Sequence, residues 1–103
     1  MTAEELFWHL AGELHATHPE VREGTIMKSR CLHVGKEFLA LTGYKDAGLV
    51  VKLPKARVAE LIEAGQGEPF GPGSKIFKEW VSIPEVDADL WRALLLEGVA
   101  FVG

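Results

Sequence analysis

The chain has 103 residues, of which 48% are hydrophobic and 25% are charged, values that are ordinary for one globular domain. No apolar run approaches the roughly 18 residues that a membrane span needs, and the first twenty residues carry too many charges for a signal peptide. The only cysteine, Cys31, cannot form an internal disulfide, so we expect a single cytoplasmic domain over residues 1–103.

The N-terminal segment 2–17 predicts an amphipathic helix. Thr2 and Glu5 have the spacing of a capping box, in which each side chain satisfies a free N–H group at the helix start. His18 precedes Pro19 and ends the helix, because a residue before proline is pushed out of the α region. One apolar stripe is expected to face the core: Leu6, Phe7, Leu10, Ala11 and Leu14.

Residues 24–53 predict a run of strands. Gly35-Lys36 suits a type II′ hairpin turn, because glycine tolerates the positive φ that this turn requires. Segment 43–48 is rich in turn-forming residues and predicts a connection. The expected strands are Gly24–Met27, Cys31–Val34, Glu37–Leu41 and Leu49–Leu53.

A second helix is expected to begin with Pro54 in its first position, where the missing N–H costs nothing. Its buried face is Val58, Leu61 and Ile62, and Gly65 stands where a C-terminal glycine belongs.

The composition of residues 66–75 predicts a loop, and 76–83 predicts a strand. Its alternation places Ile76, Lys78, Trp80 and Ser82 on one face, with Phe77, Glu79, Val81 and Ile83 on the other.

Asp87 is the expected N-cap of the last helix. Gly98 within this helix costs roughly 1 kcal/mol relative to alanine, so we expect it to allow close packing on the sheet. The apolar face of the helix is predicted to be Leu90, Trp91, Leu94, Leu95, Gly98, Phe101 and Val102.

The predicted order is therefore helix, three strands, helix, one or two strands, helix. We expect an α+β fold of two layers, with three helices packed on one face of an antiparallel sheet, because this arrangement buries all the apolar faces.

Charge is unevenly distributed although the net charge is only −4. Segment 22–57 has eight basic and three acidic residues, so it carries +5 and the remainder of the chain carries −9. A solvated sheet face explains this pattern, since Lys and Arg discourage edge-to-edge pairing. A surface for an anionic ligand is the alternative explanation, and we favour the solvated face because charge segregation alone is weak evidence. The basic residues are Arg22, Lys28, Arg30, Lys36, Lys45, Lys52, Lys55 and Arg57.

Histidine and cysteine raise the question of a zinc site. His15 and His18 lie three residues apart, and Cys31 and His33 alternate on an expected strand. This spacing matches no zinc-finger pattern, so we expect no metal. Cys31 is interpreted as a small core residue rather than a nucleophile. We find no catalytic motif and expect a non-enzymatic domain without a cofactor.

Five segments, in their order and spacing, resemble one known family. They are Val21–Thr25, Cys31–Lys36 leading into Phe38, Leu49–Leu53, Lys78–Val81 and Val99–Val102. Together they resemble the MmcQ/YjbR-like proteins, small bacterial proteins related in shape to the N-terminal domain of the TfoX competence regulators. The similarity spans Leu6 to Val102. It implies a two-layer fold like that of the secretion chaperones, and it brings the label DNA-binding.

Two functional hypotheses follow. In the first, the chain is a nucleic-acid-associated module that meets phosphates through basic side chains of the middle segment: Lys28, Arg30, Lys36, Lys45 and Lys52. In the second, it is a protein-interaction or homodimerising module that uses a free sheet edge or the surface near Trp8, the aromatic residue expected to be partly exposed. Neither hypothesis involves a membrane.

Overall fold

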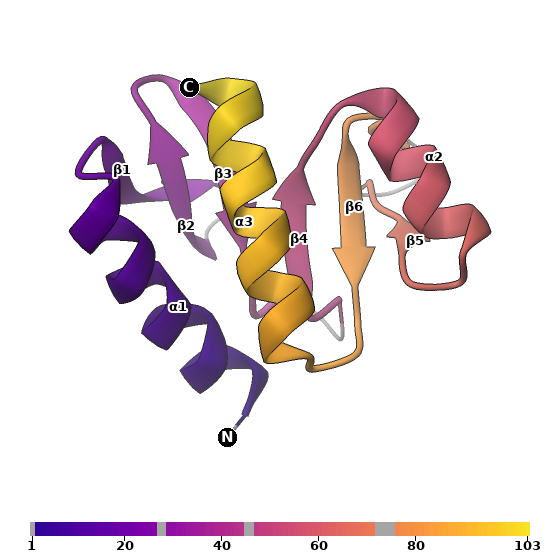
Figure 1. Ribbon diagram of the computed structural model, residues 1–103, viewed down its shortest axis with the longest axis horizontal. Coiled ribbons are helices and arrows are strands. Elements are labelled where there is room, and N and C mark those ends of the chain that lie inside the picture. The colour runs from indigo at the N-terminus through magenta and orange to yellow at the C-terminus, as the bar shows by residue number, and fades with distance from the viewer. Residues whose placement is uncertain (1, 27–28, 45–46, 72–75) are drawn as a thin grey trace.

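The computed structural model describes residues 2–26, 29–44, 47–71 and 76–103. Its elements alternate helices with runs of strands (Figure 1). In chain order they are α1 (Ala3–Thr17), β1 (Val21–Ile26), β2 (Ser29–Val34), β3 (Glu37–Leu41), β4 (Leu49–Lys52), α2 (Lys55–Glu63), β5 (Glu68–Pro69), β6 (Trp80–Ile83) and α3 (Ala88–Val102).

The strands form one sheet in the order β1-β2-β3-β4-β6-β5, and every neighbouring pair is antiparallel. The predicted α+β class is confirmed. Four strands separate α1 from α2, which agrees with the four strand segments expected there one by one, although the predicted order of elements counts three. Two strands, β5 and β6, follow α2, and β5 lies within the segment that was expected to be a loop.

The strand predicted over 76–83 is shorter than expected, because β6 begins only at Trp80. The Phe77 N–H donates to the Phe70 carbonyl at 2.8 Å, and the Trp80 N–H donates to the Phe77 carbonyl at 3.0 Å. The chain therefore closes a turn just before β6 starts. This turn gives Lys78 and Glu79 a place on a loop rather than on a strand.

All three helices pack on the same face of the sheet, as predicted. α3 crosses in front of the sheet, with α1 and α2 on either side of it (Figure 1). Their buried side chains belong to one apolar core, which we call the helix-side core; it includes Leu10 of α1, Leu61 of α2 and Leu94 of α3. The core also takes in strand residues such as Val51 and Val81.

Helix ends follow the sequence signals closely. The Glu5 N–H donates to Thr2 Oγ1 at 3.1 Å and the Thr2 N–H donates to Glu5 Oε1 at 2.9 Å, which confirms the capping box. Asp87 is confirmed as an N-cap, since its carboxylate accepts from the Leu90 N–H. Pro54 is the residue before α2 rather than its first residue. Gly65, with φ of 77°, follows the end of α2 as expected.

A bulge in β3 changes which side chains face the helices. Leu32 pairs with Ala40 and His33 pairs with Phe38, so Leu39 is an extra residue between them. The two residues of such a bulge no longer alternate normally, and both Leu39 and Ala40 pack in the helix-side core. Phe38 therefore faces the other side of the sheet.

The face of α3 against the sheet is nearly as predicted. Gly98 allows close approach, because a Cβ atom there would lie 2.7 Å from Leu39 Cδ1 and 3.2 Å from the Lys52 carbonyl oxygen. The prediction for Phe101 was wrong: this side chain is 38% exposed, and Val99 is buried in its place. Helical geometry explains the exchange, since position 99 lies four residues after the buried Leu95.

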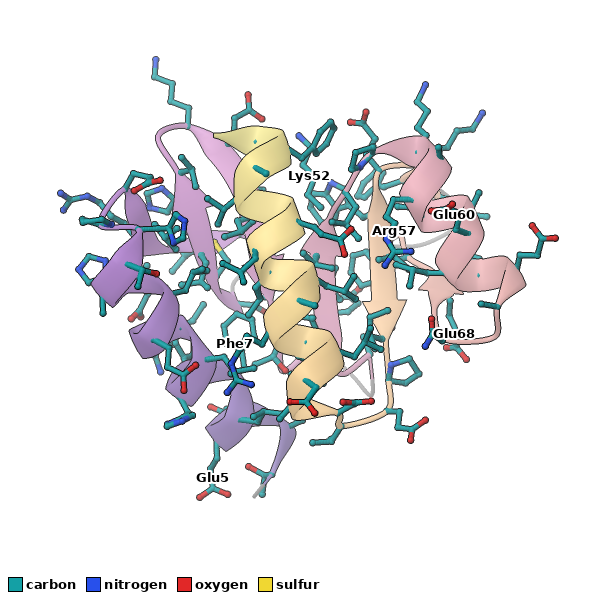
Figure 2. The ribbon with its side chains drawn as sticks, in the orientation of Figure 1. Glu5, Phe7, Lys52, Arg57, Glu60 and Glu68 are labelled. Carbon is teal, nitrogen blue, oxygen red and sulfur yellow. The ribbon has the colours of Figure 1, made fainter. Side chains whose placement is uncertain are left out.

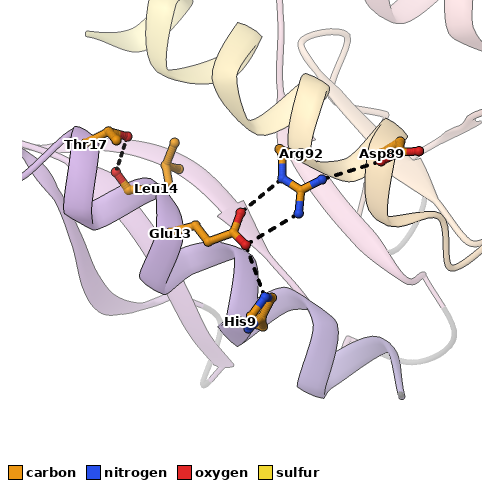
Figure 3. A network of polar contacts seen from close by, with 6 residues as sticks. All are labelled: His9, Glu13, Leu14, Thr17, Asp89 and Arg92. Carbon is orange, nitrogen blue, oxygen red and sulfur yellow. Dashed lines mark hydrogen bonds and ion pairs between the residues drawn. The ribbon is translucent and has the colours of Figure 1, made fainter.

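A polar network closes the outer rim between α1 and α3 (Figure 3). Arg92 Nε donates to Glu13 Oε1 at 3.0 Å, and its Nη1 lies 3.5 Å from Asp89 Oδ1. His9 Nε2 lies 3.1 Å from the other oxygen of Glu13. The hydrogen bond from Arg92 holds the pKa of Glu13 below its ordinary value.

The opposite face of the sheet carries a second apolar cluster. Along β4, Leu49 and Val51 face the helices while Val50 faces away, as strand alternation requires. We call this group the second cluster. Its buried members are Cys31, Leu41, Val50 and Phe70, and its half-buried members are Ile26, Phe38, Tyr44, Ala47, Phe77 and Trp80.

Candidate functional site

The cations proposed from the sequence are only partly described by the structure. Lys28 and Lys45 lie outside the described residues. Arg30 lies on β2, Lys36 is exposed in the turn between β2 and β3, and Lys52 lies at the end of β4.

Arg30 lies on the helix side of the sheet, next to α1. Its Nε donates to Glu23 Oε2 at 2.7 Å, and its guanidinium sits 4.1 Å above the ring of Trp8. The hydrogen bond from Arg30 lowers the pKa of Glu23 below its ordinary value, which keeps the partner ionised. Arg30 is thus neutralised, and Trp8 is half-buried with a cation over its ring.

Lys52 lies on the opposite face from Arg30, because its neighbour Val51 belongs to the helix-side core and its cross-strand partner Trp80 belongs to the second cluster. The described cations of the predicted set therefore do not gather on one surface. Lys52 Nζ donates to Oε2 of Glu37, the first residue of β3, at 3.2 Å. Figure 2 labels Lys52 on its strand and Arg57 on the neighbouring helix.

A different group of lysines gathers around Lys52. Lys55, the first residue of α2, and Lys78, in the turn before β6, line a shallow hollow of about 550 Å³ together with Lys52. Both Lys55 and Lys78 are exposed, and within the described part of the chain neither has an ion-pair partner. Glu79 also lines this hollow. We call Lys52, Lys55 and Lys78 the lysine group.

Aromatic rings lie directly beside the lysine group. Trp80 stacks on Phe38, with ring centroids 4.1 Å apart and an interplanar angle of 17°. Phe77 meets Trp80 edge-on at 4.9 Å, and Phe70 lies parallel to Trp80 at 5.7 Å. Offset-stacked and edge-to-face pairs at these distances attract one another, so Trp80 is held in place by rings from three other segments.

A second hollow of about 320 Å³ adjoins the first, beneath α2. It shares five lining residues with the first hollow: Lys55, Ile76, Phe77, Lys78 and Trp80. Ile76 is 66% exposed. The remaining walls of the second hollow are apolar: Val58, Ala59, Ile62 and Pro69. The two hollows together form an apolar recess with cations at its mouth.

Local chain geometry explains how distant residues meet here. Pro54 separates β4 from α2, so Lys52 and Lys55 lie close in sequence but on different elements. The Leu53 N–H donates to the Glu79 carbonyl at 2.9 Å, which fixes the turn that carries Lys78 against the end of β4. Lys78 was not among the predicted cations, because the alternating pattern of 76–83 predicts a strand at this residue. Lys55 could have indicated the site from the sequence, because it is the next basic residue after Lys52.

The four residues considered for zinc do not converge. His15 Nδ1 lies 2.8 Å from the Val21 carbonyl and His33 Nδ1 lies 2.9 Å from the Gly35 carbonyl, so both rings have backbone partners. Cys31 is buried in the second cluster, and burial raises the pKa of its thiol. Among residues 2–26, 29–44, 47–71 and 76–103, no three His, Cys, Asp or Glu side chains gather at a distance suited to a metal ion.

Comparisons with models of protein families, with curated proteins and with solved structures gave no match. The resemblance to the MmcQ/YjbR-like proteins therefore stays a prediction from the sequence. Of the helices in the described residues, none combines the length and the apolar character needed to cross a membrane.

Proposed function

We propose that this chain is a non-enzymatic, cytoplasmic module that binds nucleic acid through the lysine group. The observation that carries the proposal is the meeting of Lys52, Lys55 and Lys78 around one hollow, with two of them exposed and unpaired within the described residues. Phosphate groups are the polyanionic ligand that such a cluster suits, since each lysine that binds a phosphate releases a counterion. The family resemblance points the same way.

The local charge is modest. The lysine group carries three positive charges, and the carboxylates of Glu37 and Glu79 lie within it or beside it, which leaves one net positive charge. We therefore expect weak binding that is sensitive to salt. For a single strand, binding of three phosphates gives a log–log slope of affinity against salt of about −2.

The test is fluorescence anisotropy with labelled DNA, both single-stranded and duplex, at low and at physiological salt. Lys55→Glu and Lys78→Glu should each weaken binding, and the salt slope should fall by roughly 0.7 to 0.9 for each phosphate that the variant no longer binds. Arg22→Glu is the matched control, because it makes the same charge change at the far edge strand of the sheet. Absence of binding at low salt, or equal weakening in all three variants, would overturn the proposal.

A further inference from the structure

The apolar recess beneath α2 indicates which form of nucleic acid the site binds, which the lysine group alone does not. Resting on the proposed function, we infer that this site takes single-stranded rather than duplex nucleic acid. One unpaired base enters the recess, and the flanking phosphates meet the lysine group at its mouth.

The walls of the recess are mostly apolar. Apart from Lys55, Lys78 and Trp80, its lining side chains carry no polar atom. Its volume of about 320 Å³ lies at the lower end of the range, about 300 to 1,000 Å³, in which proteins hold small organic groups. The flat π faces of a nucleobase suit such walls, provided that its polar edge stays toward the open mouth of the recess.

Two cations lie where the two hollows meet. Lys55 and Lys78 line both hollows, so they stand where the apolar recess opens onto the lysine group. A ligand that fills both hollows would therefore join a part that packs on apolar walls to anionic parts. A nucleotide unit within a strand has this construction, with a base between two phosphates.

A single strand fits this recess better than a duplex does. In a duplex each base is stacked on its neighbours and paired along its edge, so it cannot enter a recess without first being unstacked. In a single strand the bases are free to splay out onto apolar and aromatic side chains. Phe77 and Trp80 border the recess, and Trp80 is held rigidly by its stack on Phe38.

The walls also bear on sequence preference. A recess lined by Val58, Ala59 and Ile76 offers no hydrogen bonds to the edge of a base. Binding by stacking and apolar packing tolerates all bases, because every base has a π face. We therefore expect little discrimination among strands of different sequence.

The test compares a fluorescein-labelled single strand of about 12 nucleotides with the duplex that it forms with its complement, at low salt. The wild-type chain should bind the single strand at least roughly tenfold more tightly. Ala59→Phe fills the recess and should remove this preference. Ala56→Phe is the matched control, since Ala56 is another exposed alanine of α2 and does not line the recess.

Both alanines are exposed, so neither substitution disturbs the core, and thermal melting would show whether each variant is folded. Ile76→Ala gives a second check, because it removes an exposed wall of the recess and should weaken single-strand binding without unfolding the chain. Equal affinity for strand and duplex, or a preference that survives Ala59→Phe, would overturn this inference while the proposed function stood. If neither form of DNA binds, both proposals are wrong.

Discussion

The two faces of the sheet differ in the type and the burial of their apolar side chains. On the helix side, aliphatic residues together with Phe7 and Trp91 are fully buried between the three helices and the sheet. On the other side, several of the apolar side chains are aromatic rings that remain half-buried and pack on one another, such as Phe38 on Trp80. Since stability follows the apolar area removed from water, we expect the helix-side core to hold the fold. The half-covered face is then free to carry a binding surface.

Two tryptophans offer the sharpest comparison, because Trp91 belongs to the helix-side core and Trp80 to the second cluster. Trp91 is 0% exposed and its Nε1 donates to the Glu85 carbonyl at 2.9 Å. We expect Trp91→Ala to lower the free energy of unfolding by about 3–5 kcal/mol, and Trp80→Ala to lower it by about 2 kcal/mol. Urea unfolding followed by circular dichroism measures both. Equal effects in the two variants would remove the distinction between the faces.

Glycine tests how closely the helix layer meets the sheet. Gly98→Val forces a branched side chain against Leu39 and the Lys52 carbonyl, so we expect the free energy of unfolding to fall by roughly 1–3 kcal/mol. Gly12 is the matched control in α1, because a Cβ atom there would meet nothing within 4 Å. Gly12→Ala should therefore stabilise the chain by about 0.5–1 kcal/mol. A stabilising Gly98→Val would show that the packing between α3 and the sheet is loose.

The same helices also show what the sequence could reveal. Periodicity and capping signals are local, so the helix starts at Thr2 and Asp87 and the close packing at Gly98 were predictable. The bulge at Leu39 was not, because it depends on the register between two strands. The burial of Val99 in place of Phe101 follows from local spacing, since position 99 lies four residues after the buried Leu95.

The candidate site was harder to predict than the fold, for the same reason. Lys52 was predicted from the sequence, but its neighbours in space come from the start of α2 and from the turn before β6. That turn is set by hydrogen bonds from Phe77 and Trp80, which no apolar pattern encodes. The charge pattern revealed the basic segment and could not tell that Arg30 and Lys52 lie on opposite faces.

Cys31 provides a reporter for the second cluster. It is 3% exposed, and burial raises the pKa of its thiol, so a thiol reagent should label the native chain slowly. If the half-covered face opens locally, Phe38→Ala should speed labelling by more than its decrease in global stability explains. Gly98→Val supplies the contrast, since it weakens the helix side and should act only through global unfolding. Labelling rates that track global stability in both variants would mean that the faces open together.

The smallest effect is expected at the solvent-exposed rim of the helix layer, where Glu13 pairs with Arg92. The pKa of Glu13 is lowered in the folded chain from its ordinary value of 4.5, chiefly by the hydrogen bond from Arg92. The stabilisation is therefore present above the unfolded pKa and is lost as the pH falls through the folded pKa. Glu13→Gln should lower the melting temperature slightly at neutral pH, and this difference from wild type should vanish in acid. Glu63→Gln makes the same charge change at an exposed site with no ion pair in the described residues, so it should show no such trend.

High salt should reduce the effect of Glu13→Gln on the melting temperature, because exposed charges are screened. A difference from wild type that persisted in acid would instead mean that Glu13 contributes through packing on α1.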